Sequence, residues 1–224
     1  MKLAVAPLVL STFGLMLGVS QNAQAGLIPN VTATASGMTF GTPLGSLAAT
    51  TNGVGLPLNR PSLTGDHAAS SSANSWQSAV QSTVNNSLIA NLVLEFDFNR
   101  TYALSGFSFW NYSGTTNASL QGIKNVTIEY KLGAGPWTAL TGAPTLFAAG
   151  NSSTGGAATV QQFNFAPVYA TNVRFRNMSN FGSLTLGNNR VGLNEIQFTS
   201  IPEPSSTLAL LALGLAGVGL RKRV

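Results

Sequence analysis

The chain is poor in the residues that build disulfides, metal sites and acid–base catalysis. It has no cysteine, one histidine and six acidic residues among 224. The absence of cysteine excludes disulfides, thiolate metal sites and a cysteine nucleophile. Charged residues make up only 8% of the chain, against about 25% in a typical soluble domain. A coiled coil or a long helical bundle needs Glu, Lys and Arg on its solvent-exposed faces, so both architectures are excluded.

Uncharged polar residues take the place of charge, and the positive charge that exists is concentrated at the chain ends. The chain has 24 glycines and is rich in Ser, Thr and Asn, which favours a β-rich domain that meets water through hydroxyl and amide groups. Residues 26–200 hold seven basic and five acidic side chains. This near balance is too weak for an electrostatic nucleic-acid footprint, so we expect no nucleic-acid partner.

The N-terminus has the pattern of a secretory signal peptide. Lys2 precedes an apolar run over residues 3–19, and the small-x-small motif Ala23-Gln24-Ala25 follows. The pattern predicts recognition by the Sec machinery and cleavage by signal peptidase after Ala25. A membrane anchor is the alternative, but the apolar run is short and the Ala-x-Ala motif is well placed.

The C-terminus combines three parts in a fixed order. Pro202, Glu203 and Pro204 precede an apolar run over residues 208–220, and Arg221, Lys222 and Arg223 close the chain. Thirteen residues at a rise of 1.5 Å span about 20 Å, which makes a marginal transmembrane segment beside a hydrocarbon core of about 30 Å. The basic cluster is expected to stay cytoplasmic, so the segment would act as a stop-transfer signal that leaves the domain outside.

This arrangement over residues 201–224 resembles the PEP-CTERM sorting signal of Gram-negative bacteria. The resemblance implies recognition by an exosortase, cleavage near residues 202–204, and a transient inner-membrane anchor. It then implies release to the outer cell surface or an exopolysaccharide matrix, as in a biofilm. A plain tail anchor is the alternative, but it does not need Pro-Glu-Pro.

The sequence between residues 26 and 200 predicts short strands that are separated by polar turns. In residues 92–98 the side chains of Leu92, Leu94, Phe96 and Phe98 fall on one face, opposite Glu95 and Asp97. Further alternating segments lie at 104–112, 125–132, 137–140, 160–165, 172–177 and 193–199, with a first candidate at 31–36. Short strands, turn residues between them and no good helix predict one all-β domain over 26–200, an antiparallel β-sandwich.

Four of these segments, in order, resemble discoidin-type domains, the galactose-binding-like jelly rolls. They are residues 94–107, the hairpin 126–140 with its Gly turn and Trp, the Val-Arg strand 171–176, and the closing Glu-Ile strand 192–198. The resemblance covers residues 60–199. It implies a jelly roll and a carbohydrate-binding type of function. The sequence departs from the family in the early loop, where Gly65-Asp66-His67 stands in place of Asp-Gly.

The resemblance also implies one structural Ca²⁺ between the early Asp loop and the closing Glu strand. The matching residues are Asp66 and Glu195, with backbone carbonyls of residues 65–71 completing the shell. Ca²⁺ takes six to eight oxygen ligands, many of them backbone carbonyls of flexible loops. No other cofactor is expected.

Candidate ligand-binding side chains are aromatic or basic and lie opposite core faces or in loops. We expect Trp110, Tyr112 and Phe181 to offer flat rings to sugar C–H faces. Arg174 and Arg176 alternate with the inward residues of their strand and are placed to clamp an anion or a sugar, although a merely solvated face is the simpler interpretation. Trp76 and Trp137 are assigned to the core.

Two catalytic interpretations are weaker. Glu95 and Asp97 form a carboxylate pair on one strand face, as in glycoside hydrolysis, and Asp66-His67 supplies two members of a triad without a nucleophile motif. A solvated face and a loop explain them more simply. We therefore predict a non-catalytic, exported carbohydrate-binding module with a polysaccharide partner. A structural surface protein without a ligand is the alternative, and a secreted hydrolase is the third choice.

Overall fold

The computed structural model describes residues 26–37, 42–79, 88–89, 91–182 and 189–201. Its elements, in chain order, are β1 (Gly26–Leu27), β2 (Thr32–Ser36), β3 (Leu44–Gly45), η1 (Leu47–Thr50), η2 (Pro57–Asn59), β4 (Trp76–Gln77), β5 (Leu88–Ile89), β6 (Val93–Asn111), α1 (Thr116–Leu120), β7 (Thr127–Lys131), β8 (Thr138–Ala139), β9 (Gln161–Arg176), β10 (Met178–Ser179) and β11 (Gly192–Ser200). The predicted all-β antiparallel architecture is confirmed, since every strand pair between these elements is antiparallel.

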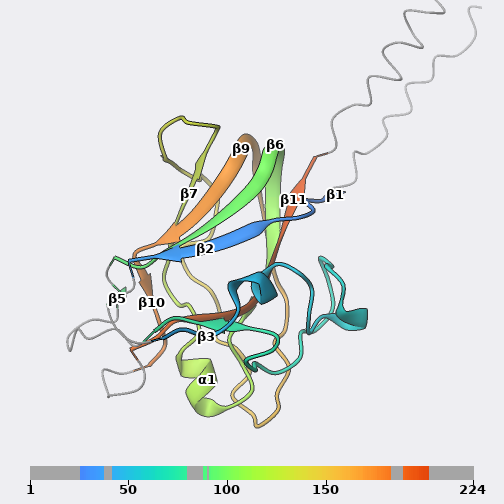
Figure 1. Ribbon diagram of the computed structural model, residues 1–224, viewed down its shortest axis with the longest axis vertical. Helices are drawn as coiled ribbons and strands as arrows, with labels where there is room; N and C mark the ends of the chain where they lie inside the picture. The colour runs from blue at the N-terminus through green and yellow to red at the C-terminus, as the bar shows by residue number, and fades with distance from the viewer. Residues whose placement is uncertain (1–25, 38–41, 80–87, 90, 183–188, 202–224) are drawn as a thin grey trace, which may run out of the picture.

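Two long strands connect the two halves of the molecule. β6 has 19 residues and β9 has 16, and they pair along most of their length with register shifts between Asp97 and Tyr102 and between Leu104 and Gly106. The N-terminal half of β6 and the C-terminal half of β9, which we call their outer halves, belong to the group β2-β6-β9-β7-β8. The C-terminal half of β6 and the N-terminal half of β9, their inner halves, belong to the group β3-β4-β11-β6-β9. Figure 1 shows β6, β9 and β7 side by side above the level of β3 and α1.

Aromatic side chains from both groups fill the space between them. Phe96 and Phe175 come from the outer halves of β6 and β9, and Phe198 comes from β11. The ring centroids of Phe96 and Phe198 lie 5.4 Å apart, and those of Phe96 and Phe175 lie 5.3 Å apart. The alternation in residues 92–98 is confirmed, because Leu92, Leu94, Phe96 and Phe98 are all buried.

Two pairs of segments predicted as separate strands are single strands. The predicted segments 92–98 and 104–112 are the two halves of β6, and 160–165 and 172–177 are the two halves of β9. The break in alternation at residues 98–103 is a register shift, and Asn99 takes a positive φ of 61° there. An irregularity of this kind bends a strand without ending it.

The segment between η1 and β4, residues 51–75, covers the second face of β11, and we call it the covering segment. All nine residues of β11 are buried, although alternation predicts that only every second one faces the core. Backbone groups of the covering segment bind β11 and its neighbour: Gln197 donates to the Thr51 carbonyl, and Trp110 on β6 donates to the Gly65 carbonyl. This segment therefore forms a second, more polar layer.

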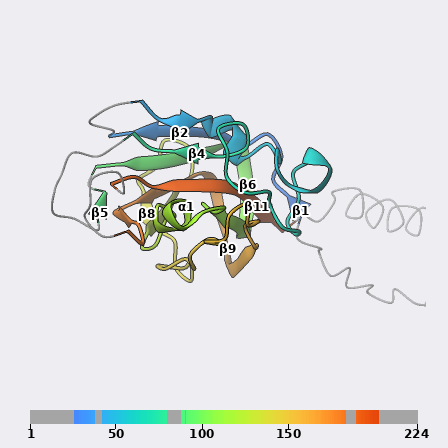
Figure 2. The same cartoon turned by 90° about the horizontal axis from the view of Figure 1, so that it is seen from below.

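The two ends of the described chain lie together. β1 pairs with the end of β11, with Gly26 opposite Ser200 and Leu27 opposite Thr199. Figures 1 and 2 show both ends leaving the domain at the same place. Any attachment through the C-terminal segment therefore holds the domain by this one edge.

Candidate functional site

The outer face of the β2-β6-β9-β7-β8 group carries most of the charge of the domain. Strand register aligns two rows of outward residues across this face: Thr34, Glu95, Arg174 and Glu129 in one row, and Thr32, Asp97, Asn172 and Lys131 in the next. Of the twelve charged residues in 26–200, seven lie on or beside it, namely Glu95, Asp97, Arg100, Glu129, Lys131, Arg174 and Arg176. We call this surface the charged face.

The charged side chains on this face hold one another in place. Lys131 Nζ lies 2.9 Å from Glu95 Oε1, which also accepts a hydrogen bond from Asn172. Glu129 binds two arginines, with Arg174 Nε at 2.6 Å and Arg176 Nη2 at 2.9 Å. The predicted proximity of Arg174 and Arg176 is thus present, and a shared carboxylate fixes both guanidinium groups.

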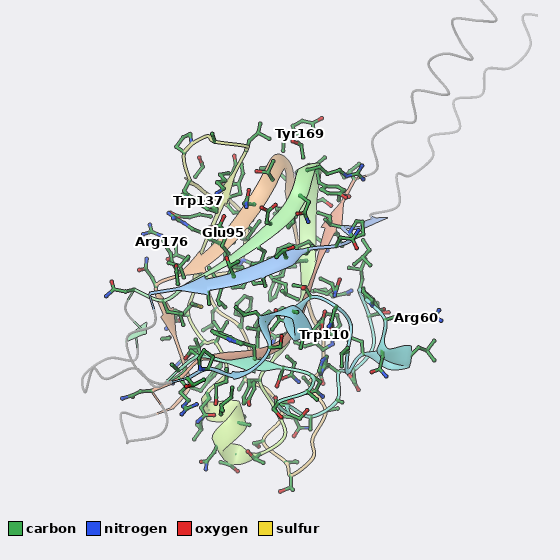
Figure 3. All side chains as sticks on the ribbon, in the orientation of Figure 1. Arg60, Glu95, Trp110, Trp137, Tyr169 and Arg176 are labelled. Atoms are coloured by element: carbon green, nitrogen blue, oxygen red, sulfur yellow. The ribbon has the colours of Figure 1, made fainter. Side chains whose placement is uncertain are left out.

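Trp137 stands at the border of the charged face, and its assignment to the core is wrong. The residue is half-buried; it follows the turn 133–136 and comes just before β8, the strand at the sheet edge. The Arg174 guanidinium carbon lies 4.3 Å from the centroid of its ring, and Lys131 Nζ lies 4.6 Å from it. Cations near an indole ring at this distance are attracted by its π-electrons. Figure 3 shows Trp137, Glu95 and Arg176 gathered on this part of the sheet.

A shallow depression lies on the charged face, and Lys131, whose Nζ is near the Trp137 ring, is one of the residues that line it. Its volume is about 470 Å³, and it is lined by Glu95, Asp97, Asn99, Arg100, Lys131, Gly133, Thr171 and Asn172. Almost all of these residues carry a side-chain hydrogen-bonding group. The arrangement combines an aromatic ring with fixed donors and acceptors at an open surface, which suits a hydroxyl-rich ligand.

The two carboxylates considered for hydrolysis are already engaged. Glu95 is paired with Lys131 and Asn172, and Asp97 Oδ1 accepts from the backbone N–H of Asn99 at 2.7 Å. His67 is likewise buried, with its two ring nitrogens 2.7 Å from the Ala68 carbonyl and 2.9 Å from the Val54 carbonyl. Burial lowers the pKa of this imidazole, against the raising effect of its backbone partners. These contacts favour structural roles for all three residues.

The expectation that Trp110 faces a ligand is wrong. Its side chain is fully buried, and its indole N–H donates to the Gly65 carbonyl at 2.8 Å. The alternation along β6 does point Trp110 away from the aromatic core, as expected. The covering segment closes over this second face, however, so the ring packs with Leu56 and Ala158.

Tyr112 and Phe181 lie near α1, away from the charged face. Both are half-buried. The Tyr112 ring is packed so closely on Gly192 that a Cβ there would stand 2.7 Å from it, and burial raises the pKa of its hydroxyl. Phe181 donates its backbone N–H to Leu120 of α1, and Lys124 Nζ lies 5.7 Å from its ring centroid. These two predicted ligand residues therefore do not share a site with Arg174 and Arg176.

Glu195 is the buried carboxyl group that the sequence analysis placed near an early loop. It is fully buried, and its Oε1 accepts from the backbone N–H of Gly53 at 3.1 Å and from the Gln197 amide. Among the described residues, its Oε2 has no hydrogen-bond partner. Burial raises the pKa of this carboxyl to about 8, and the bonds from Gln197 and Gly53 oppose the shift only in part.

Only half of the predicted calcium pair fits a cation. An unpartnered, buried carboxylate oxygen beside loop backbone is a suitable Ca²⁺ ligand, and Glu195 meets that description. Asp66 is exposed, and no hydrogen bond or ion pair joins it to Glu195. The loop residues that reach Glu195 and its neighbour Gln197 are Gly53 and Thr51. Within the described residues, no three of His, Asp and Glu gather as a metal site.

The comparisons with known proteins concern the C-terminus and the fold. Residues 200–223 match the model of the PEP-CTERM protein-sorting motif. The predicted sorting signal is therefore confirmed as a motif, and it marks an exported protein with a C-terminal sorting signal. The predicted sorting residues, Ala25, Pro202, Glu203, Pro204, Arg221, Lys222 and Arg223, lie outside the described residues. In the part that is described, no helix is long and apolar enough to cross a membrane.

The body is similar in fold to family 32 carbohydrate-binding modules. One is the module of Clostridium perfringens NanJ in complex with galactose, with 11% identity, a TM-score of 0.41, and coverage of 79% of this chain and 99% of that one. Another is the first such module of a family 31 glycoside hydrolase from the same organism, with 11% identity, a TM-score of 0.46, and coverage of 77% and 95%. No curated protein sequence matches the chain.

Proposed function

We propose that the protein is an exported, non-catalytic carbohydrate-binding module that is displayed at the cell surface or in an exopolysaccharide matrix after exosortase processing. The observation that carries the binding function is Trp137 at the border of the charged face, in contact with Lys131, which also lines a depression of hydrogen-bonding side chains. The PEP-CTERM motif supports the sorting part of the proposal. Exosortase and a polysaccharide are the proposed partners.

The physical properties of the charged face suit a sugar. A pyranose ring has an apolar C–H face, which packs on an indole, and hydroxyls at its rim, which need donors and acceptors. Here the donors and acceptors are held by ion pairs before any ligand arrives. Side chains that are already ordered lose less conformational entropy on binding than free ones. Lys131, Arg174 and Asn172 are the proposed contacts beside Trp137.

The test uses the secreted protein and two aromatic variants in affinity electrophoresis through gels that contain bacterial exopolysaccharides. Trp137→Ala removes the ring of the charged face. Tyr169→Ala is the matched control, because Tyr169 is 61% exposed and lies apart from Trp137 at the top of the sheet. We expect polysaccharide to retard the wild type and Tyr169→Ala but not Trp137→Ala. Equal retardation of all three proteins contradicts the assignment of the site.

The α1 surface with Tyr112 and Phe181 is a second candidate site, because a lysine stands over an accessible aromatic ring there as well. Retained binding by Trp137→Ala together with lost binding by Phe181→Ala favours it. A protein that no polysaccharide retards favours the structural alternative, a surface protein without a ligand.

We also propose one structural Ca²⁺ at Glu195. The unpartnered, buried Oε2 of Glu195 supports this proposal, and backbone carbonyls of the covering segment are the expected further ligands. The ion would keep the carboxylate charged and tie the covering segment to β11. Asp66 is left out, since it makes no contact with Glu195.

A further inference from the structure

β2 is an edge strand with one free side. It pairs with β6, Thr34 opposite Glu95, and among the described residues no strand pairs with its other edge. The Thr51 hydroxyl binds the carbonyl of Val31, just before the strand. η1 lies beside β2, and a cleft of about 350 Å³ there is lined by residues 30–33 together with Ala48, Thr51, Asn52 and Pro61. An edge of this kind presents unpaired N–H and C=O groups at every second residue.

This edge lacks the features that normally prevent strand association. The sequence of β2 is Thr-Ala-Thr-Ala-Ser, without a charge or a proline, and its pairing with β6 has no bulge. By contrast, β3 and β8 have only two residues each. Charges, prolines, bulges and very short edge strands are the usual protection. The inward-facing Ala33 and Ala35 also remain half-buried although they pack on the core.

The β2 sequence is complementary to itself in the antiparallel direction. Centred on Thr34, a second copy places Thr34 opposite Thr34, Ala33 opposite Ala35, and Thr32 opposite Ser36. Hydroxyl residues then face outward on both strands and alanines face inward on both. Threonine pairs across antiparallel strands are favourable, and no like charges meet. We propose that a second copy of this chain pairs with β2 in this register and forms a two-fold symmetric dimer.

Such a dimer extends one sheet through both copies. A two-fold axis at Thr34 keeps the outward residues of both copies on the same side, so the two charged faces lie next to each other. If the charged face binds polysaccharide, as proposed above, the dimer engages one polymer at two points and gains avidity. A five-residue strand pair is smaller than a standard protein interface, so the dimer is expected to depend on protein concentration.

The cysteine-free sequence allows a register-specific test in the secreted protein. Residues opposite each other in an antiparallel pair have Cα atoms about 4.5–5.5 Å apart, within the roughly 4.4–6.8 Å that a disulfide needs. Thr34→Cys is therefore expected to form a disulfide-linked dimer under mild oxidation. Ser36→Cys is the matched control: it is equally exposed on the same strand, but about 13 Å from its copy because the two are offset by four residues.

We expect Thr34→Cys to cross-link at least tenfold faster than Ser36→Cys at micromolar concentration. Equal rates indicate random collision and overturn the proposal. In sedimentation at rising concentration, the wild type is expected to dimerise and Thr34→Lys is not, because two lysines would face each other at the axis. Thr138→Lys on β8 is the control and is expected to dimerise. A wild type that stays monomeric at several hundred micromolar also overturns the proposal. None of these results depends on polysaccharide binding, so they separate failure of the dimer from failure of the proposed function.

Discussion

The buried carboxyl of Glu195 predicts that the protein loses stability as the pH rises through the neutral range. In the unfolded chain a glutamate carboxyl has a pKa near 4.5, and burial raises the pKa of Glu195 to about 8 in the folded protein. The folded state therefore holds a proton that the unfolded state has released. The contribution of Glu195 to the free energy of unfolding is therefore fully present below about pH 4.5 and is lost by about pH 8.

The size of this effect follows from the pKa shift. Each unit corresponds to about 1.4 kcal/mol, so the rise from 4.5 to about 8 corresponds to roughly 5 kcal/mol in the absence of divalent cations. Domains of this kind unfold with a total free energy of about 5–15 kcal/mol. A loss of this size lowers the melting temperature by about 10–20 °C for a domain of this length.

The assay compares melting temperatures of the wild type and Glu195→Gln from pH 5 to pH 9 in EDTA. Glutamine keeps a carbonyl oxygen for the Gly53 N–H and the Gln197 amide but never ionises. At pH 5 the two proteins are expected to agree within about 1 kcal/mol, and at pH 9 the variant should be more stable by up to about 5 kcal/mol. Asp66→Asn is the control, because it removes an exposed carboxylate from the covering segment.

The shifted pKa values of His67 and Tyr112 do not produce the same pH dependence. Burial lowers the pKa of His67, so its contribution to stability is complete above its unfolded pKa of about 6.5 and is lost below it, which is the opposite direction. Burial raises the pKa of Tyr112 from 10, above the range of the assay. Parallel stability curves for the wild type and Glu195→Gln between pH 5 and 8 would refute the reasoning, because Glu195 would then be ionised without cost.

Three further predictions concern the core, the sorting signal and calcium. Trp110→Ala should destabilise the protein by about 3–5 kcal/mol, whereas Trp137→Ala, which removes a half-buried ring, should cost less than half as much; similar losses in urea unfolding would contradict the placement of the two rings. Replacing Pro202, Glu203 and Pro204 by alanine should retain the protein in the inner membrane with its tail intact, and normal release of that variant would argue against exosortase processing. Millimolar Ca²⁺ at pH 8 should raise the free energy of unfolding of the wild type by about 2.7 kcal/mol at a hundredfold excess over Kd, and with it the melting temperature, but should leave Glu195→Gln unchanged; identical melting curves, with no metal found by elemental analysis, would discard the Glu195 site.

Alternating hydrophobicity predicted the strands and their inward faces, because alternation is a local property of the sequence. The inward set of residues 92–98 and the inward Val173 and Phe175 of β9 are all buried. Alternation could not show that two predicted strands continue into one. The pairing of β6 with β9 persists through the register shift at Asp97 and Tyr102, and only the partner strand reveals this.

The covering segment was not predictable, because side-chain to backbone hydrogen bonds hold it and no hydrophobic period marks it. The bonds from Gly53 to Glu195 and from Gln197 to Thr51 each join residues more than 140 positions apart. Because the sequence does not reveal these hydrogen bonds, alternation alone predicts Trp110 and Glu195 to be outward residues on exposed strand faces. The same missing layer explains why Trp110 was expected at a ligand site.

The charged face was predictable only in part. The outward positions of Arg174, Arg176, Glu95 and Lys131 follow from alternation within each strand. Their assembly depends on the strand order β6-β9-β7, since β9 lies between two strands that come before it in the chain. Trp137 was missed because a turn and a short edge strand give no alternation long enough to assign its face.

The most direct test of carbohydrate binding at the charged face uses the intrinsic fluorescence of the protein. Trp76 and Trp110 are fully buried, so Trp137 is the tryptophan that a quencher in solution reaches. Acrylamide quenching should therefore affect mainly Trp137, and a polysaccharide that retards the protein in gels should reduce that quenching. Binding that leaves the quenching of Trp137 unchanged would contradict the account, because the ligand would then lie elsewhere on the molecule.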